Sequence, residues 1–509
     1  MPVLPSPSTD PLFRAGVGRL FAVVAVASMF LCIAMPVFAQ EAYYWTYSRH
    51  PDLSYFDHPP MVAWTIWLGT QVFGHGPLGL RIGMVLCGLG STLAGLLLVR
   101  RFGLDRNAQR GWILLALAVP LYVLTHFYAN PDAPLLLGWS IALWALWRVR
   151  ETGGIGWWIL AGAAAGFGLL AKYSASFLAV GGVLLLLFDP RYRRQLRTPG
   201  PWIGVLCATL VFAPVILWNL RNHFESFRFQ TEGRWSRGSL GTRWLGEFVV
   251  NQLLGYHPAL AILTIPVIVW LWRRMRAGDP RAGFLLAFGV PMPAFFLVNS
   301  LFIQVKINWL LPAYMPLLIG TLMWWRETEP EARLPRLSRS VRCAVAWTPF
   351  LIALAPLAHV WPQGGGSSWK GWDELAPIAM GWKDKIDAED GVRGNVFFFC
   401  SDYKDAAQLG RSLFLQHCRS GSKEPLAPML AQNVFGETAL QFDHWESPRD
   451  HIGQDAIYVL PRAEDRPREV EKITRHFRKV EMVYPFELKV LGVRQMYADV
   501  YVCRGYLGP

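Results

Sequence analysis

The sequence predicts a polytopic α-helical membrane protein with about 11–13 transmembrane helices and a small C-terminal soluble α/β domain. Of its 509 residues, 53% are hydrophobic, 24 are tryptophan, and the apolar residues are gathered in long runs. Only 17% are charged, against roughly a quarter in soluble domains. The formal charge of +13 does not indicate nucleic-acid binding, because membrane proteins concentrate basic residues in cytoplasmic loops.

The apolar runs predict the membrane spans in order. They lie near residues 17–39, 78–99, 111–128, 132–148, 155–172, 174–189, 201–219, 256–272, 282–304, 307–325 and 343–361. The stretches 61–77 and 240–255 are expected to be helices lying on the membrane surface. The first run has an alternative interpretation as a cleaved signal peptide, since Val37-Phe38-Ala39 resembles a cleavage site, but its length favours a span.

Arginine residues in alternate connections predict the topology. The basic connections are 100–110, 148–150, 191–197, 273–281 and 326–342. This positive-inside pattern places the N-terminus in the cytoplasm. The remaining connections then face outward, and they contain Glu41, Asp57, Asp132, Lys172, the 220–255 stretch and Lys306.

The composition becomes polar beyond the Gly-Gly-Gly-Ser-Ser segment at 364–368. We therefore expect a membrane domain over residues 1–361 and a periplasmic soluble domain over 362–509, which is long enough for one small fold. Strands are expected at 394–399, 456–460 and 497–503. The three cysteines of this region allow one disulfide and one free thiol without fixing the pair: Cys400, Cys418 and Cys503.

Two carboxylates follow the first predicted span. Glu41 is followed by a run of aromatic residues, and Asp57 stands before His58 and two prolines. A carboxylate at a membrane surface is costly to desolvate, so two held close together indicate a catalytic site. Tyr44 is a further candidate, although each aromatic residue of this run, taken singly, is also what an aromatic belt at the membrane interface contains.

Three more outward-facing charges are candidates for the same site. Asp132 begins a predicted helix and is either its N-cap or a site residue. Lys172 joins two apolar helices and is either a lysine reaching the membrane interface or a cation for an anionic lipid headgroup. Lys306 has the same two interpretations.

The outward segment 221–243 is unusual because it is basic. It contains Arg228 and Arg234 and either binds phosphate or is an ordinary solvated face. No grouping of histidine, cysteine and acidic residues has metal-site spacing, and no glycine-rich phosphate loop follows a strand. The sequence therefore predicts no required cofactor and no direct use of a soluble nucleotide, and it leaves metal dependence open.

These blocks together resemble a known family. The matching blocks are Glu41-Ala42-Tyr43-Tyr44-Trp45, Tyr55-Phe56-Asp57-His58-Pro59-Pro60, Pro131-Asp132-Ala133-Pro134-Leu135, Ala171-Lys172-Tyr173, and Lys306 through Trp309 to Tyr314. Their order and outward placement resemble the polyprenyl-phosphate-dependent GT-C glycosyltransferases, in the bacterial branch similar to protein O-mannosyltransferases and the lipid A aminoarabinose transferase. The resemblance covers roughly residues 17–361, and the C-terminal part matches only in being an external soluble domain.

The resemblance implies roles for the candidate residues. The family carries an Asp-Glu pair after the first span, with an acid as catalytic base, whereas this chain has Gln40-Glu41. An amide cannot act as a base, so Glu41 or Asp57 must activate the acceptor. Lys172 stands where the aminoarabinose transferase has a lysine contacting the donor phosphate, and His58 stands where that enzyme has a lysine after the acid.

The resemblance implies an inverting glycosyltransferase that uses a sugar on a polyprenyl phosphate. A carboxylate takes the proton of the acceptor hydroxyl, and cations stabilise the leaving phosphate. The acceptor is a lipid such as lipid A, a glycan or a protein, and the sequence does not choose among them. The alternatives are a flippase for a lipid-linked glycan, which would place ionisable groups at mid-membrane, and a non-catalytic assembly protein.

Overall fold

The computed structural model describes residues 16–235, 240–328, 369–391, 394–422, 424–461 and 466–509, with residues 354 and 357. Contacts divide the chain into two compact units. The first comprises residues 1–33, 52–65 and 81–353, and the second comprises 34–51, 66–80 and 354–509. The predicted span at 343–361, apart from residues 354 and 357, and the segment 364–368 lie outside the described residues.

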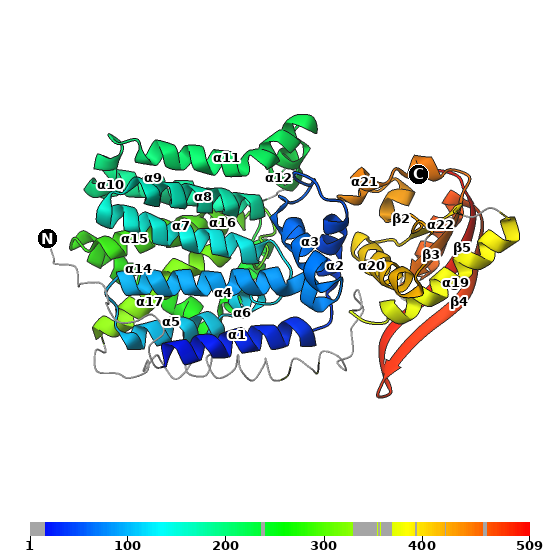
Figure 1. Ribbon diagram of the computed structural model, residues 1–509, viewed down its shortest axis with the longest axis horizontal. Helices are drawn as coiled ribbons and strands as arrows, with labels where there is room; N and C mark the ends of the chain where they lie inside the picture. Colours follow the sequence, from blue (N-terminus) through cyan, green and yellow to red (C-terminus); the bar gives the residue numbers. More distant parts are fainter. Residues whose placement is uncertain are drawn as a thin grey trace. The chain divides into compact units, whose positions relative to one another are not determined.

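The first unit is helical (Figure 1). Its helices, some of which run on into segments of the second unit, are α1 (Val17–Ala34), α3 (Met61–Phe73), α4 (Pro77–Arg101), α5 (Arg106–Ala118), α6 (Pro120–Leu124), α7 (Asp132–Thr152), α8 (Ile155–Ala171), the 3₁₀ helix η1 (Tyr173–Ser176), α9 (Phe177–Phe188), α10 (Pro190–Gln195), α11 (Gly200–Arg221), α12 (Glu225–Trp235), α13 (Arg243–Tyr256), α14 (Pro258–Arg276), α15 (Pro280–Gly289), α16 (Pro291–Asn299) and α17 (Leu311–Thr328).

Among the described residues, five helical segments are long and apolar enough to cross a membrane: Val17–Ala34, Pro77–Arg101, Gly200–Arg221, Pro258–Arg276 and Pro280–Asn299. The chain is therefore a multi-pass membrane protein, as the apolar runs predicted. The helices expected over 61–77 and 240–255 are α3 and α13, and their position on the membrane surface remains a prediction.

Two predicted spans are each divided by a proline. The 111–128 run forms α5 and α6, with Pro120 at the first position of α6. The 282–304 run forms α15 and α16, with Pro291 at the first position of α16. Proline lacks the N–H that continues a helix but suits its first turn, so a continuous apolar run does not give a continuous helix.

Glycine contacts bring α7, α8 and α11 side by side (Figure 1). A Cβ added to Gly138 of α7 would lie 2.7 Å from the carbonyl oxygen of Ala164 in α8. A Cβ added to Gly162 of α8 would lie 2.0 Å from the carbonyl oxygen of Gly204 in α11. Small residues let membrane helices approach at backbone distance, so these contacts fix α8 between its two neighbours.

The second unit combines helices with one mixed sheet. Its elements are α2 (Ala39–Arg49), α19 (Trp372–Asp390), β1 (Val396–Phe399), α20 (Tyr403–Ser420), β2 (Met429–Leu430), η3 (Gln432–Phe435), α21 (Phe442–Trp445), η4 (Pro448–His451), β3 (Asp455–Leu460), α22 (Arg466–His476), β4 (Phe477–Val490) and β5 (Val493–Tyr506). The strand order is β2-β1-β3-β5-β4. β1 pairs in parallel with β2 and β3, whereas β5 pairs antiparallel with β3 and β4.

Strand β1, which lies between β2 and β3, is buried on both faces. Phe397 and Phe399 pack in a core that includes Tyr458 of β3 and Ile473 of α22. Phe398, which points to the opposite face, lines a pocket with residues of α19 and α20. This layering confirms the predicted α/β domain and its strands at 394–399, 456–460 and 497–503, while β4, whose exposed residues include many charges, was not predicted.

The cysteines of the second unit form no disulfide with one another. Cys400 and Cys503 are buried free thiols, and Cys418 is an exposed free thiol. The pairing that the sequence allowed is therefore wrong. Burial raises the pKa of the Cys400 and Cys503 thiols well above its usual value, so both stay protonated and unreactive near neutral pH.

The α8–α11 contact makes a prediction about stability. Replacing Gly162 by leucine forces the two backbones apart, and overpacking of this kind costs about 1–3 kcal/mol. We expect the detergent-purified Gly162→Leu protein to melt at a lower temperature than the parent. The matched control is Gly182→Leu in α9, where an added Cβ meets nothing within 4 Å. Equal melting temperatures for the two variants would contradict the close contact.

Candidate functional site

The centre of the first unit's polar site is an ion pair between two helix ends. Only Gly153 and Gly154 separate α7 from α8, so the helices are antiparallel neighbours and the start of α7 lies beside the end of α8. Lys172, immediately after α8, places its Nζ 2.7 Å from Oδ1 of Asp132, the first residue of α7. The Asp132 side chain is 1% exposed and the Lys172 side chain 14% exposed.

Asp132 is not the cap of its helix, which corrects one of its two interpretations. The side-chain oxygen of Asn130 accepts hydrogen bonds from the backbone N–H groups of Asp132 and Ala133, at 3.0 and 3.2 Å. The Asp132 carboxylate is therefore available for other partners. Its second oxygen accepts a hydrogen bond from Nδ2 of Asn308, so the pair is a cluster of three side chains.

The loop containing Asp57 is fastened to α11 and α12. Trp218 of α11 donates to Oδ2 of Asp52 at 2.8 Å. Gln230 of α12 donates from Nε2 to the backbone oxygen of Asp57 at 2.9 Å. His58 Nε2 lies 3.8 Å from Oδ2 of Asp57, and the Asp57 side chain is 7% exposed. The loop therefore holds a shielded carboxylate next to an imidazole.

A hydrophobic cluster joins this loop to the Lys172 turn. Met61, which follows the loop, packs with Leu135 of α7, Leu170 of α8 and Val215 of α11. Tyr173, next to Lys172, packs against the same cluster, and its hydroxyl lies 2.7 Å from that of Ser226 in α12. Ser226 lies one helical turn before Gln230 of α12, and Gln230 donates to the backbone oxygen of Asp57. Asp57 and Lys172, 115 positions apart in the sequence, therefore belong to one polar region.

Three other predicted cations are placed differently. Lys306 is exposed and donates to Oε1 of Gln304 at 2.6 Å. Arg228 is an exposed residue of α12. Arg234 also lies in α12, and its side chain is outside the described residues. A role of these cations in phosphate binding remains a prediction.

Glu41 and Tyr44 lie in α2, which belongs to the second unit. Glu41 is fully buried, and its Oε2 accepts the backbone N–H of Phe38 at 2.9 Å, so this carboxylate caps its own helix. Tyr44 is 4% exposed and contacts the rings of Tyr43 and Tyr47. The aromatic run therefore packs inside the protein, which corrects its interpretation as a membrane-interface belt.

The neighbouring contacts of α2 show how firmly it is held. The Tyr43 hydroxyl accepts the backbone N–H of Gln441 at 3.1 Å. The Trp45 indole donates to Nδ1 of His75 at 3.1 Å. Burial, assisted by the charges of Arg49 and Arg411, lowers the pKa of His75, so its ring stays neutral and keeps Nδ1 as an acceptor near neutral pH. Glu41 is thus set on a rigid helix.

The first unit's cluster suits the binding of an anion. An ammonium has three N–H donors, and one donor of Lys172 is directed to Asp132, which leaves two for phosphate oxygens. Asp57 supplies a carboxylate that can accept a proton. Among the described residues, no group of three or more histidine, cysteine and acidic side chains could hold a metal ion.

Sequence reasoning missed Asn308, Asn130 and Gln230 as contributors. Asn308 was noted only as a neighbour of Lys306 in the sequence, and nothing in a single sequence distinguishes an amide that binds a carboxylate 176 positions away from a solvated one. The Asn-Pro-Asp order at 130–132 did carry a signal for capping, since asparagine is as good an N-cap as aspartate.

Comparison with known proteins confirms the expected resemblance. Residues 57–218 match the family described as dolichyl-phosphate-mannose-protein mannosyltransferase. The chain is 27% identical over 295 residues to the lipid A galacturonosyltransferase RgtD of Rhizobium johnstonii, covering 57% of this chain and 60% of that protein. It is 34% identical over 185 residues to the undecaprenyl phosphate-alpha-4-amino-4-deoxy-L-arabinose arabinosyl transferase of Pseudomonas aeruginosa, covering 35% of this chain and 33% of that protein.

A solved structure extends the comparison to the whole fold. ArnT from Cupriavidus metallidurans bound to undecaprenyl phosphate superposes with a TM-score of 0.60 at 17% identity, covering 96% of this chain and 98% of that one. The chain therefore has a GT-C fold. The sequence alignments span 60% and 33% of the two relatives' own lengths, which is less than two thirds.

The buried pair makes a prediction about stability. Removing one partner of a buried ion pair costs about 3 kcal/mol because the other charge is left uncompensated, whereas replacing both by apolar side chains is often neutral. We expect Asp132→Leu and Lys172→Met each to lower the melting temperature and the double variant to recover part of the loss.

The control is Arg475→Ala, which removes an ion pair with Glu471 between side chains that are 71% and 66% exposed and should leave melting nearly unchanged. Strictly additive losses at positions 132 and 172 would show that the two side chains do not interact.

Proposed function

We propose that this chain is a glycosyltransferase of the bacterial inner membrane, which moves a sugar from a polyprenyl phosphate to a lipid, glycan or protein acceptor on the periplasmic side with inversion. The observation that carries the proposal is that the Asp132–Lys172–Asn308 cluster and the Asp57–His58 pair are joined by one hydrophobic cluster and by hydrogen bonds to the same helix, α12. The names of the relatives describe transfer from undecaprenyl phosphate or to lipid A, which supports this donor and this class of acceptor.

Lys172 binds the donor phosphate. Its ammonium is held by Asp132, whose own position is fixed by Asn308, so the cation is oriented before the donor arrives. As the bond between the anomeric carbon and the phosphate oxygen breaks, negative charge grows on the departing polyprenyl phosphate. A preorganised cation lowers the energy of that charge, and Arg228, Arg234 and Lys306 add further positive charge.

Asp57 or Glu41 takes the proton of the acceptor hydroxyl. The hydroxyl oxygen then forms its bond to the anomeric carbon on the face opposite the phosphate, so one displacement inverts that centre. The sugar passes through an oxocarbenium-like state, which the other carboxylate stabilises. His58 lies beside Asp57 and orients it, and Tyr44 contributes to the substrate site. The reaction as written needs no metal ion.

Two carboxylate variants test this chemistry. Asp57→Asn and Glu41→Gln should each lower the rate at least about 100-fold. One variant removes the base, and general-base catalysis contributes 10²–10⁴-fold; the other removes the negative charge that stabilises the oxocarbenium-like state. Glu41→Gln keeps an oxygen that can still accept the Phe38 N–H, so it removes charge without removing the helix cap. The measurement is transfer of radiolabelled sugar from a polyprenyl phosphate by purified protein in lipid vesicles.

The matched control is Glu232→Gln, an exposed acidic residue of α12 that should transfer at the parent rate. Addition of EDTA should leave the rate unchanged. Parent activity in both carboxylate variants would eliminate this site, loss in EDTA would require a metal, and movement of the lipid-linked sugar across the bilayer without any transfer would favour the flippase.

The orientation of the second unit can be measured with a native thiol. Cys418 is exposed, whereas Cys400 and Cys503 are buried and their raised thiol pKa values keep them unreactive. We expect a membrane-impermeant maleimide to label the protein in intact spheroplasts and Cys418→Ser to abolish that label. Labelling only after the spheroplasts are lysed would place this unit in the cytoplasm.

A further inference from the structure

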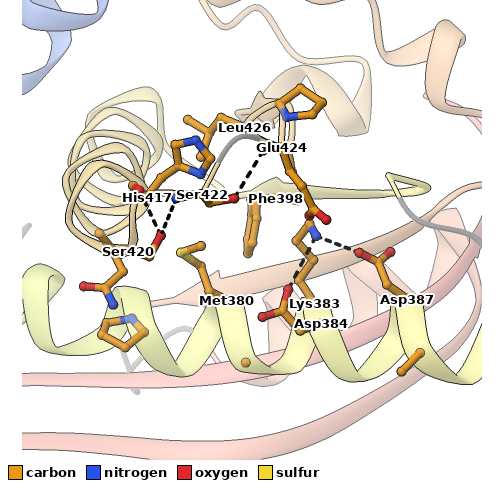
Figure 2. A pocket seen from close by; sticks show the side chains of 16 residues that line it. Met380, Lys383, Asp384, Asp387, Phe398, His417, Ser420, Ser422, Glu424 and Leu426 are labelled. Carbon is orange, nitrogen blue, oxygen red and sulfur yellow. Dashed lines mark hydrogen bonds and ion pairs between the residues drawn. The ribbon is translucent and has the colours of Figure 1, made fainter.

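The second unit contains a pocket apart from the carboxylates assigned above. It has a volume of about 540 Å³ and is lined by residues of α19, β1, α20 and the segment that follows α20, and Figure 2 shows its side chains. The volume lies within the range of roughly 300–1,000 Å³ that is usual for small-molecule sites. The pocket lies wholly within one unit, so its geometry is that of a single folded body.

One wall of the pocket is charged. Nζ of Lys383 lies 2.7 Å from Oδ2 of Asp387 and 3.6 Å from Oδ1 of Asp384. Figure 2 shows Glu424 facing these residues from the segment after α20. Three carboxylates therefore surround one ammonium, which makes the wall rich in hydrogen-bond acceptors and unfavourable for an anion.

The hydrogen bonding of Asp387 gives a second, independent indication that the pocket binds a ligand. Its side chain is 8% exposed, and its Oδ1 has no hydrogen-bond donor among the described residues. A shielded carboxylate oxygen without a donor is destabilising. A donor brought by a ligand, either directly or by ordering the groups around Asp387, would remove that cost.

The middle of the pocket is apolar. Figure 2 shows Met380 and Phe398 between the charged wall and the polar side chains of His417 and Ser420. The acceptors of the charged wall, the Lys383 ammonium and the polar residues of α20 together offer both donors and acceptors. A sugar hydroxyl donates one hydrogen bond and accepts others, and the C–H face of a pyranose ring can cover apolar side chains. An anionic sugar would meet three carboxylates.

We propose that this pocket binds a pyranose that carries no negative charge, either neutral or amine-bearing. The hydroxyl or ammonium groups donate to Asp384, Asp387 and Glu424, Lys383 donates to ring or hydroxyl oxygens, and the C–H face lies on Met380 and Phe398. The inference rests on the second unit alone and does not depend on the proposed transfer.

Binding of labelled monosaccharides to the full-length protein in detergent, without a lipid-linked donor, tests the proposal. We expect glucose and glucosamine to bind at millimolar concentrations and galacturonic acid to bind at least roughly tenfold more weakly. Asp387→Asn and Asp384→Asn should each weaken binding roughly tenfold. The Asp384 side chain is 70% exposed, so this second variant folds even if the first does not.

Leu426→Trp places a larger side chain on a pocket-lining residue that is 38% exposed and should abolish binding. The matched control is Glu374→Gln, an exposed acid on the same helix outside the pocket, which should bind like the parent. The proposal is overturned if neither glucose nor glucosamine binds, if galacturonic acid binds equally well, or if both Asp384→Asn and Leu426→Trp bind as the parent does. Loss of transfer in the assay above would leave these results unaffected.

Discussion

A buried carboxylate that must be compensated is the constraint on which the first unit's polar site depends. Asp132 is 1% exposed, and a charge so shielded is tolerated only with partners. Its partners are Lys172 and Asn308, which come from the end of α8 and from the segment before α17. The pair lies at the ends of two helices, α7 and α8, that glycine contacts allow to approach at backbone distance. The close packing of α7 and α8 therefore also sets the position of the two charges in the site.

The packing of α7, α8 and α11 also holds the loop that contains Asp57. Met61 and Tyr173 enter a common hydrophobic cluster with residues of α7, α8 and α11, while Trp218 and Gln230 hold the loop by hydrogen bonds. A carboxylate on a free loop would sample many positions, whereas one tied at both ends keeps a defined distance to its surroundings. Preorganisation of this kind is what electrostatic catalysis requires.

The second unit uses its carboxylates differently. Glu41 completes a helix cap and is itself fully buried, so its structural and chemical roles have to be separated by a substitution that keeps the hydrogen bond. In the α19 pocket, Asp387 leaves one oxygen without a donor among the described residues. The contrast between a satisfied and an unsatisfied carboxylate is the physical basis for assigning a ligand to the pocket.

The sequence by itself determined the membrane class, the C-terminal α/β fold and the positions of its candidate charges, because hydrophobic runs and strand patterns are local properties. It did not determine that Pro120 and Pro291 would divide predicted spans, that Asn130 rather than Asp132 would cap α7, or that Tyr44 would be buried. Only the tertiary structure decided the partner of each charged side chain: Lys172 donates to Asp132, while Lys306 donates to Gln304. Such pairings depend on how closely helix backbones approach in space, and a linear pattern of residues does not specify that distance.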